Sequence, residues 1–288
     1  MTPSAAAPPG ARDAAAPLRW PAEAIWEAVE PLLPGFSVEV LPAIDSTNSE
    51  LMRRARASRC DPVLLVAERQ HAGRGRQGRV WQSEAAGAAP PAPVGASLTF
   101  SLGLPLAPAD WSGLSLAVGA AVAGALHPEI GIKWPNDLWW RDRKLVGILV
   151  ETAGMAAPEA GPGAGSRYVV VGVGINVAPR TVDGMDAPPA SLQDMLPGID
   201  APAALLRVAR PLAEAVRAFE AGGFSTFAAA FAARDALRGR PVALSDGTRG
   251  LALGVADDGA LLLRGEGGAQ QAVSSGEVSV RPTDRRPG

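Results

Sequence analysis

The stretch Ile132–Lys144, which reads IKWPNDLWWRDRK, is the segment around which the chain is organised. The sequence holds 27 lysines and arginines, and only Lys133 and Lys144 are lysines. Both lie in this stretch, whereas every other basic side chain is an arginine. An ammonium is a compact point charge with rotatable donors, and a planar guanidinium does not substitute for it. We infer that these two positions require an ammonium; chance retention at exposed turn positions is the alternative.

The same stretch predicts two strands and a hairpin. Apolar residues over Ile130–Trp134 indicate a strand, which Pro135-Asn136-Asp137 interrupts. Trp139-Trp140 and Leu145–Glu151 then flank a polar turn at 141–144, the pattern of a β-hairpin. We therefore expect both lysines to lie close to this hairpin.

A central strand is predicted over Tyr168–Val177, which reads YVVVGVGINV. Gly172 and Gly174 lie on one face of it because side chains alternate along a strand. A glycine in a strand leaves room for a flat group to approach the backbone, or for a helix to pack closely. The sequence leaves these two interpretations open.

The remaining pattern predicts an α+β fold, with a mixed central sheet flanked by helices and a small C-terminal β-barrel. Helical spacing covers 22–33, 110–126, 203–221 and 224–237, and strand patterns cover 36–43, 62–68 and 97–102. After Gly239 the chain changes to short strands at 241–244, 250–255, 261–264 and 271–280, with Asp-Gly turns between them. We expect a flexible leader at 1–18, a main domain at 19–238 and the barrel at 239–283. An Ala- and Pro-rich exposed insertion is expected at 85–94.

Composition excludes several classes of protein. The chain has 288 residues, 47 % of them hydrophobic, so it can bury a substantial core. A formal net charge of −2 argues against a generally basic nucleic-acid-binding protein. No apolar run is long enough to span a membrane. With one cysteine, Cys60, and no secretory signal pattern, we expect a reducing cytoplasm.

A loop rich in glycine and arginine is the second candidate site. Residues 69–81 read RQHAGRGRQGRVW, and three glycines and three arginines share the seven residues Gly73–Arg79. Glycine costs backbone entropy on ordering, and neighbouring guanidiniums repel one another unless an anion binds. Such a loop suits a phosphate or carboxylate held by bidentate hydrogen bonds. A solvated basic turn or a nucleic-acid contact is the alternative.

The segment Asp45–Glu50, DSTNSE, joins a predicted strand to a predicted helix. Thr47 and Glu50 have the spacing of a capping box. In one interpretation, therefore, the hydroxyls of Ser46 and Thr47 simply cap the helix. Alternatively, Ser46 and Thr47 present hydroxyls to a small polar ligand. Local sequence does not decide between these roles.

The chemical inventory favours nucleotidyl or phosphoryl transfer. The sequence shows no His or Cys cluster of the kind that binds a transition metal, and no Ser-His-Asp set. It offers fixed positive charge around a single carboxylate, Asp137, and such sites act by positioning and charge stabilisation. Asp137 is a candidate Mg²⁺ ligand because Mg²⁺ prefers oxygen ligands.

Five ordered motifs resemble those of the biotin protein ligase family, the biotin–[acetyl-CoA-carboxylase] ligases. They are DSTN at 45–48, QxAGRGRxGRxW at 70–81, KWPNDL at 133–138, KLxGILxE at 144–151 and GxGINV at 172–177. The resemblance extends over about 36–282. It implies a catalytic domain like that of the class II synthetases and biotin ligases, followed by an SH3-like barrel.

The resemblance also implies a reaction and its partners. Biotin and MgATP would give biotinyl-5′-adenylate and pyrophosphate, and the acyl group would then pass to one lysine of a biotin carboxyl carrier domain. The biotin-binding residues would be Ser46, Thr47, Asn48, Gln70, Arg74, Gly75, Arg76 and Lys144. The ATP-binding residues would be Arg79, Lys133, Asn136, Asp137 and Asn176, with Asn176 at the adenine. Arg76, Lys133 and Lys144 would be catalytic, and the hairpin would hold the two ammoniums on opposite sides of the bond being made.

Two departures from the family pattern affect the interpretation. Gln77 stands where repressor-type members often carry arginine, and we expect tuning of the loop there. Only about 45 residues precede Ser46, part of them the Ala- and Pro-rich leader, whereas a winged helix-turn-helix needs about sixty, so we expect a monofunctional ligase that does not bind DNA. Without an apolar run of spanning length, we also expect no membrane partner. A lipoate- or octanoate-specific ligase and a biotin-responsive DNA-binding regulator are the competing hypotheses.

Overall fold

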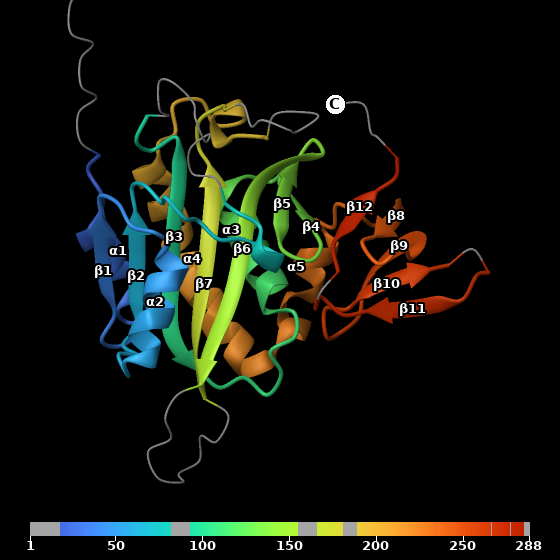
Figure 1. Ribbon diagram of the computed structural model, residues 1–288, viewed down its shortest axis with the longest axis horizontal. Coiled ribbons are helices and arrows are strands. Elements are labelled where there is room, and N and C mark those ends of the chain that lie inside the picture. Colours follow the sequence, from blue (N-terminus) through green and yellow to red (C-terminus); the bar gives the residue numbers. More distant parts are fainter. Residues whose placement is uncertain are drawn as a thin grey trace, which may run out of the picture.

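A seven-stranded sheet forms the centre of the main domain, with the strand order β1-β2-β3-β7-β6-β5-β4 (Figure 1). The computed structural model describes residues 18–81, 93–154, 166–180, 189–265, 267–276 and 278–284. Within them the strands are β1 (Ser37–Leu41), β2 (Val63–Ala67), β3 (Ser97–Leu106), β4 (Gly131–Lys133), β5 (Asp137–Trp140), β6 (Arg143–Gly154) and β7 (Arg167–Asn176). Strands β1 and β2 pair in parallel and the other neighbours are antiparallel, so the predicted mixed sheet is confirmed.

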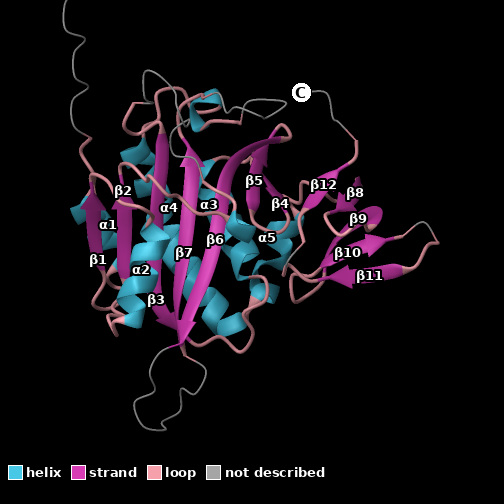
Figure 2. Ribbon diagram, viewed as in Figure 1, coloured by secondary structure: helices cyan, strands magenta, loops and turns pink. Residues whose placement is uncertain are grey.

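Helices cover the two faces of this sheet unequally (Figure 2). The α-helices of the described chain are α1 (Ala22–Val29), α2 (Thr47–Arg56), α3 (Leu114–Leu126), α4 (Ala201–Gly222) and α5 (Ala228–Ala232). Helix α2 packs on one face against β3, β6 and β7, while α3 and α4 pack together against the other face. The α2 face is therefore covered over only part of its area.

Strand β7 shows how the sequence divides between these two faces. Val169, Val171 and Val173 belong to the large core under α3 and α4. Tyr168 and Val170 alternate with them and belong to a smaller core under α2. The predicted central strand is confirmed, since β7 lies between β3 and β6.

A separate five-stranded antiparallel sheet follows the main domain, in the order β11-β10-β9-β8-β12. Its strands are β8 (Pro241–Leu244), β9 (Arg249–Val255), β10 (Leu261–Arg264), β11 (Gln270–Val273) and β12 (Val280–Pro282). It agrees with the predicted SH3-like module, and it lies beside the β4–β5 side of the main sheet in Figure 1. The predicted strand over 271–280 is wrong in extent, because β11 ends at Val273 and β12 begins only at Val280.

Several predicted helices are shorter in the structure. Helix α1 ends at Val29, short of Leu33. Helix α3 begins at Leu114 because Gly113 has a φ of 80°, and Asp110 forms a local turn in which its Oδ1 accepts from the Ser112 N–H at 2.9 Å.

The predicted helix over 224–237 is interrupted after α5. A 3₁₀ turn at Phe224–Phe227 leads into α5, and the chain then runs beside β4. The Ile132 N–H donates to the Arg234 carbonyl at 2.7 Å, and the Ala236 N–H donates to the Ile132 carbonyl at 3.0 Å. These bonds satisfy the otherwise open edge of β4, which a continued helix would leave unpaired.

Two predictions fall largely outside the described residues. Of the leader predicted at 1–18, only Leu18 is described, and of the insertion predicted at 85–94, only Pro93 and Val94. Among the described residues, no helix combines the length and apolar character needed to cross a bilayer.

Candidate active site

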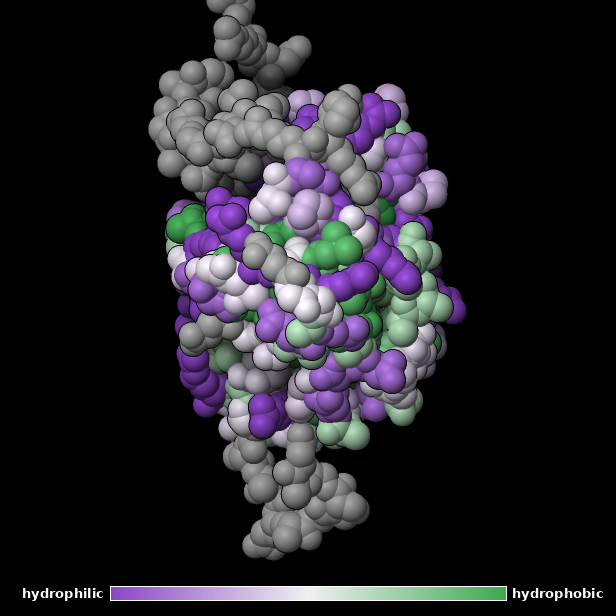
Figure 3. All heavy atoms as spheres, turned by 90° about the vertical axis from the view of Figure 1, so that its right-hand side faces the viewer, coloured by the Kyte–Doolittle hydropathy of each residue, from purple (hydrophilic) through white to green (hydrophobic). Residues whose placement is uncertain are grey.

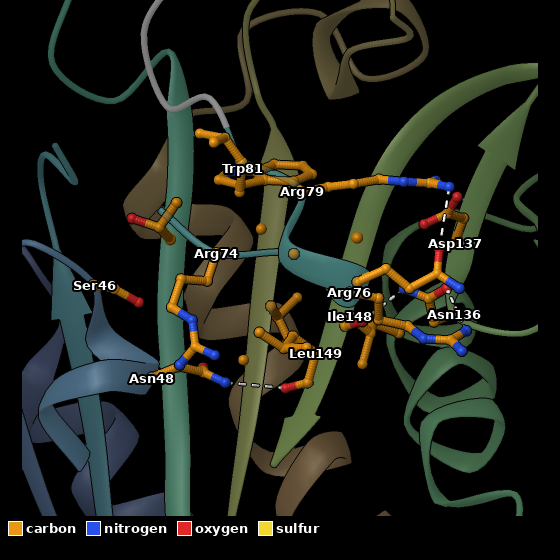
Figure 4. A pocket seen from close by; sticks show the side chains of 18 of the residues that line it. Ser46, Asn48, Arg74, Arg76, Arg79, Trp81, Asn136, Asp137, Ile148 and Leu149 are labelled. Carbon is orange, nitrogen blue, oxygen red and sulfur yellow. Dashed lines mark hydrogen bonds between the residues drawn. The ribbon is translucent and has the colours of Figure 1, made fainter. Parts of the chain in front are cut away.

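A cavity of about 150 Å³ opens on the α2 face of the sheet, beyond the area that α2 covers. Its lining comes from the start of α2, the arginine loop, strands β3 to β7 and the C-terminal domain (Figure 4). The structure brings together in this lining Ser46, Thr47, Asn48, Gln70, Arg74, Gly75, Arg76, Arg79, Lys133, Asn136, Asp137 and Lys144. Asn176 is the predicted site residue that does not line it.

One end of the cavity, the hydroxyl–amide end, is lined by Thr47, Asn48 and Gln70, and Ser101 lies behind them. The Thr47 N–H and hydroxyl donate to Gln70 Oε1 at 2.7 and 3.1 Å. A backbone N–H can only donate, so this contact assigns the Gln70 carbonyl oxygen and turns its amide NH₂ the other way. Ser101, which is fully buried, lies 2.6 Å from both Thr47 Oγ1 and Asn48 Oδ1. Ser101 was absent from the predicted site because a serine inside a strand carries no motif.

Asn48 is held more firmly than its predicted ligand role requires. Its Nδ2 donates to the Leu149 carbonyl at 3.3 Å and to Glu151 Oε2 at 3.0 Å, while its Oδ1 faces Ser101. Figure 4 shows the bond between Asn48 and Leu149, both of which line the cavity. With both N–H groups used inside the protein, Asn48 has only a free lone pair to offer a ligand.

Ser46 caps helix α2, so the predicted capping box at Thr47 and Glu50 is wrong. The Ser46 side chain accepts from the Ser49 N–H at 3.4 Å, and the helix begins at Thr47. Glu50 instead pairs with Arg53 and Arg54 at 2.9 Å each. Ser46 nevertheless lines the cavity, so the two alternatives for this segment are compatible.

The glycines of β7 make room for two side chains. A Cβ added at Gly172 would collide with the Asn48 amide, and one added at Gly174 would collide with the Trp81 indole. Gly172 therefore permits close packing of α2, and Gly174 admits a flat ring from this same protein. Both open interpretations of the glycines apply, each at one position.

The opposite end, the charged end, is centred on Asp137. Lys144 Nζ lies 2.7 Å from Asp137 Oδ1, and Lys133 Nζ lies 3.8 Å from Asp137 Oδ2. The two ammoniums thus share one carboxylate. The Lys133 side chain is only 9 % exposed and lies 5.4 Å from the Trp139 ring centre.

Burial lowers the pKa of Lys133 to about 8, with Asp137 opposing the shift and Lys144, Arg79 and Arg281 adding to it. A lysine exposed to water stays charged through neutral pH, whereas the Lys133 side chain is deeply desolvated. Its charge therefore depends on pH within the range in which enzymes work.

A β-bulge places Lys144 on the cavity face. Asp137 pairs with Gly147 and Trp139 pairs with Lys144, so one extra residue of β6 lies opposite Leu138-Trp139. The consecutive side chains of Leu145 and Val146 are both fully buried in the large core. In a regular strand one of these neighbours would face the cavity, and Lys144 would change face.

The arginine loop is anchored from three directions. Arg74 pairs with Glu151 at 3.0 Å. Arg76 donates to Asn136 Oδ1 at 3.3 Å and to the carbonyls of Ser275 and Gly276 in the C-terminal domain, the latter at 2.8 Å. Burial lowers the pKa of Arg76, with Asp137 opposing this shift and Arg79 reinforcing it.

Three further parts of the site had no predicted role. Trp81 lies over the cavity, and its ring centre is 5.7 Å from Lys144 Nζ. Glu151 holds both Arg74 and Asn48. Val278 and Ser279 of the C-terminal domain also line the cavity. Trp81 and Glu151 end the motifs at 70–81 and 144–151, so these motifs could have indicated their place in the site. Nothing in the local sequence indicates that Val278 and Ser279 line the cavity.

Asn176 lies behind Lys144 and outside the cavity lining. It is buried, and its Nδ2 donates to the Lys144 carbonyl at 3.2 Å. The observed contact positions the Lys144 backbone. The predicted contact between Asn176 and an adenine stays a prediction.

The cavity can bind an anion next to a neutral polar group. Among its described lining residues are five cations, namely Arg74, Arg76, Arg79, Lys133 and Lys144, and one carboxylate, Asp137. In the described ranges no three His, Cys, Asp or Glu side chains gather as a metal site. A surplus of fixed positive charge in a partly buried site stabilises a carboxylate and a polyphosphate brought close together. Site and fold together define the class of an enzyme that binds anionic substrates beside a neutral polar group.

Comparisons with known proteins identify the family within that class. Residues 40–176 match the Biotin/lipoate A/B protein ligase family, and 239–281 match the Biotin protein ligase C terminal domain. The biotin–[acetyl-CoA-carboxylase] ligase of Paracoccus denitrificans is 34% identical over 251 residues, 83% of this chain and 98% of that protein. The bifunctional ligase/repressor BirA of Escherichia coli is 35% identical over 264 residues, 88% of this chain and 77% of that protein.

The fold agrees with a solved structure of the same family. The biotin protein ligase of Aquifex aeolicus in complex with biotin and ATP superposes with a TM-score of 0.67 at 27% identity, covering 85% of this chain and 99% of that one. The chain belongs to the biotin protein ligase family, and its enzyme class is ligase.

Proposed function

We propose that this chain activates biotin with ATP and transfers it to a protein. Biotin carboxylate attacks the α-phosphate of ATP, pyrophosphate leaves, and biotinyl-5′-adenylate forms. The neutral amine of one lysine in a biotin carboxyl carrier domain then displaces AMP and forms an amide. The observation that carries this proposal is a single cavity with a neutral hydrogen-bonding end and an end in which Lys133 and Lys144 share Asp137.

The hydroxyl–amide end would bind the ring system of biotin. Ser46, Thr47 and Gln70 line it, and the Gln70 NH₂ is directed away from Thr47 by the contact already made there. A urea-like ring group carries both donors and an acceptor, so fixed hydroxyls and amides can match it without a charge. Arg74 and Gly75 would close over this end, and Asn48 would set its shape through Glu151.

The charged end would hold the reacting groups. Lys144, on Asp137 and under Trp81, would contact the biotin carboxylate and later the adenylate linkage. Lys133, Asn136 and Arg79 would contact the ATP phosphates, with Asn176 holding the backbone of Lys144. Two anions must be brought together here, and the cations reduce their repulsion in the transition state.

Mg²⁺ enters this reaction with ATP. Among the described cavity-lining residues Asp137 is the sole carboxylate, and Mg²⁺ is commonly held by one or two carboxylates together with phosphates and water. The donor set therefore fits, with Asp137 as the protein ligand. The ion would supply positive charge to the phosphates.

Arg76 would retain the adenylate. It already reaches Asn136 and the C-terminal domain, so the loop that carries it closes one side of the cavity. A mixed anhydride hydrolyses in water, and a closed loop excludes water until the carrier lysine arrives.

The domain boundary and the setting complete the proposal. We place the catalytic domain at 19–238 and the C-terminal domain at 239–283, and the reaction in the reducing cytoplasm, where Cys60 stays a free thiol. The acceptor is the carrier domain of a biotin-dependent carboxylase such as acetyl-CoA carboxylase.

Pyrophosphate–ATP exchange tests the substrate. We expect exchange that depends on biotin and is absent with lipoate or octanoate. A streptavidin blot of a carrier domain incubated with this protein, ATP, Mg²⁺ and biotin tests the second step. Exchange with lipoate instead of biotin would overturn the assigned substrate.

A further inference from the structure

The C-terminal domain contains a buried arginine that contacts the catalytic hairpin. Arg240 lies at the start of this domain, just before β8, and its side chain is 1 % exposed. It donates to both oxygens of Asp142 at 2.7 and 2.9 Å, and from its Nε to Asp284 at 2.9 Å. Burial alone would lower the pKa of Arg240, but the bonds to Asp142 and Asp284 outweigh it and raise that pKa.

Asp142 occupies the turn that joins β5 to β6. Arg141 and Asp142 have φ values of 49° and 57°, the left-handed conformation that a two-residue hairpin turn needs and that non-glycine residues rarely adopt. A contact that fixes Asp142 therefore favours this turn over others. Figure 1 shows the C-terminal domain beside the end of the sheet that bears this hairpin.

The turn is two residues from Lys144. The bulge that turns Lys144 toward the cavity follows directly, opposite Leu138-Trp139. A looser turn would allow the strands to slip, and a slip of one residue moves a side chain to the other face. The position of Lys144 against Asp137 thus depends on the geometry of the turn.

Arg240 is not needed merely to keep the two domains together. Trp134 Nε1 donates to the Gly259 carbonyl at 3.0 Å, and Arg76 reaches the Ser275 and Gly276 carbonyls. These contacts hold the C-terminal domain independently. Figure 3, which faces this domain, shows hydrophilic and hydrophobic residues interspersed on its surface.

We infer that Arg240 is a positioning residue for the first reaction step: through Asp142 it fixes the β5–β6 turn and so places Lys144 for adenylate formation. The inference rests on the role proposed for Lys144. Asp284, which follows β12, holds Arg240 from the end of the described chain, whereas Asp142 connects Arg240 to the hairpin that carries Lys144.

Three single variants distinguish the contact of Arg240 with Asp142 from its contact with Asp284. Arg240→Gln and Asp142→Asn should each lower kcat of biotin-dependent pyrophosphate exchange about 10- to 100-fold, with little change in KM for ATP, because a reacting group is displaced. Asp284→Asn is the matched control, since it removes a carboxylate partner of Arg240 but keeps the Asp142 contact. It should lower Tm and leave kcat close to that of the unmodified protein.

A double-mutant cycle with Lys144→Ala supplies the decisive readout. If Arg240 acts through Lys144, adding Arg240→Gln to Lys144→Ala causes no further loss. If the losses in kcat of Arg240→Gln and Lys144→Ala multiply in the double variant, the inference is wrong. It is also wrong if Asp142→Asn has a normal kcat. Asp142→Asn decides the matter if Arg240→Gln does not fold.

Hydrogen exchange separates failure of this inference from failure of the proposed role of Lys144. A near-normal Lys144→Ala variant would refute the catalytic role. Faster amide exchange over 137–147 in Asp142→Asn, but not in Asp284→Asn, would still show that Arg240 holds the turn. Unchanged exchange in both variants would refute the positioning.

Discussion

The two ends of the cavity are built by different physical means. At the hydroxyl–amide end, neutral groups bond to one another: Thr47 to Gln70, and Ser101 to Thr47 and Asn48, with donor–acceptor distances between 2.6 and 3.1 Å. At the charged end, Lys133 and Lys144 share a single carboxylate, and two arginines lie beside them. The first end has its hydrogen bonds in place before a ligand arrives, and the second has more positive charge than its own residues neutralise.

This difference suggests a division of labour. A neutral, internally bonded end holds its shape and selects a ligand by geometry, because buried polar groups are costly to leave unpaired. A charged end with few internal partners gains most when an anion binds. Substitutions at the first end should therefore change biotin affinity, and substitutions at the second should change the rate or the retention of adenylate.

Lys144→Ala should have the largest effect. We expect pyrophosphate exchange to fall by about 10²-fold or more, because a charged contact in the transition state is lost. Lys144→Arg is the control, because it keeps the positive charge but replaces the compact ammonium with a guanidinium. It should recover only part of the exchange rate. Near-normal exchange in Lys144→Ala would remove Lys144 from the reaction.

Ser101→Ala should act on the other end alone. It removes the fully buried hydroxyl that joins Thr47 to Asn48, and leaving such partners unsatisfied costs about 1–3 kcal/mol. We expect a raised KM for biotin, measured by exchange, with KM for ATP unchanged. Equal changes in both constants would show that the two ends are not separable.

Arg76→Ala should weaken retention of the adenylate rather than its formation. The Arg76 guanidinium can donate charge-assisted hydrogen bonds to a phosphate. Its loss should therefore speed adenylate release about tenfold. The measurement is free adenylate formed without carrier labelling, with Arg76→Lys as the control that keeps the positive charge. If the adenylate remains bound as tightly as before, the loop does not close over it.

The pH dependence of Lys133 should be visible in ATP binding. Because its pKa in the fold is about 8, compared with 10.5 as the ordinary value, the folded protein binds fewer protons than the unfolded chain between these values. The contribution of Lys133 to the free energy of unfolding therefore rises with pH between these two values. Over the same range Lys133 loses the positive charge that would contact ATP. We expect kcat/KM for ATP to fall above pH about 8.

Lys133→Arg is the control for that profile. An arginine stays protonated throughout, so the fall above pH about 8 should disappear whatever the absolute rate. If the variant keeps the same alkaline fall, another group is responsible for it.

The smallest expected effect is self-biotinylation, the attachment of biotin to amines of this same chain. Leaked adenylate acylates amines, and the two lysines of this chain are ion-paired with Asp137 within the cavity. We expect little incorporation of biotin, measured by mass spectrometry after incubation with biotin and ATP but no carrier. Extensive labelling at many positions would contradict this expectation.

The sequence by itself determined the alternating strands, the motif order and the chemical inventory of the site. The nearly continuous apolar run Tyr168–Val177 indicates a strand that is buried on both faces, because successive side chains of a strand point to opposite faces. The scarcity of lysine likewise pointed to Lys133 and Lys144 before any fold was known.

Only the tertiary structure decided which of these residues meet. Lys144 reaches Asp137 because a bulge buries both Leu145 and Val146, and a bulge is set by pairing with another strand. Ser101 and Arg240 gained roles from partners far away in the sequence, Thr47 and Asp142. Local pattern fixes the direction of each side chain along regular elements, whereas register, bulges and contacts between domains arise from packing between distant segments.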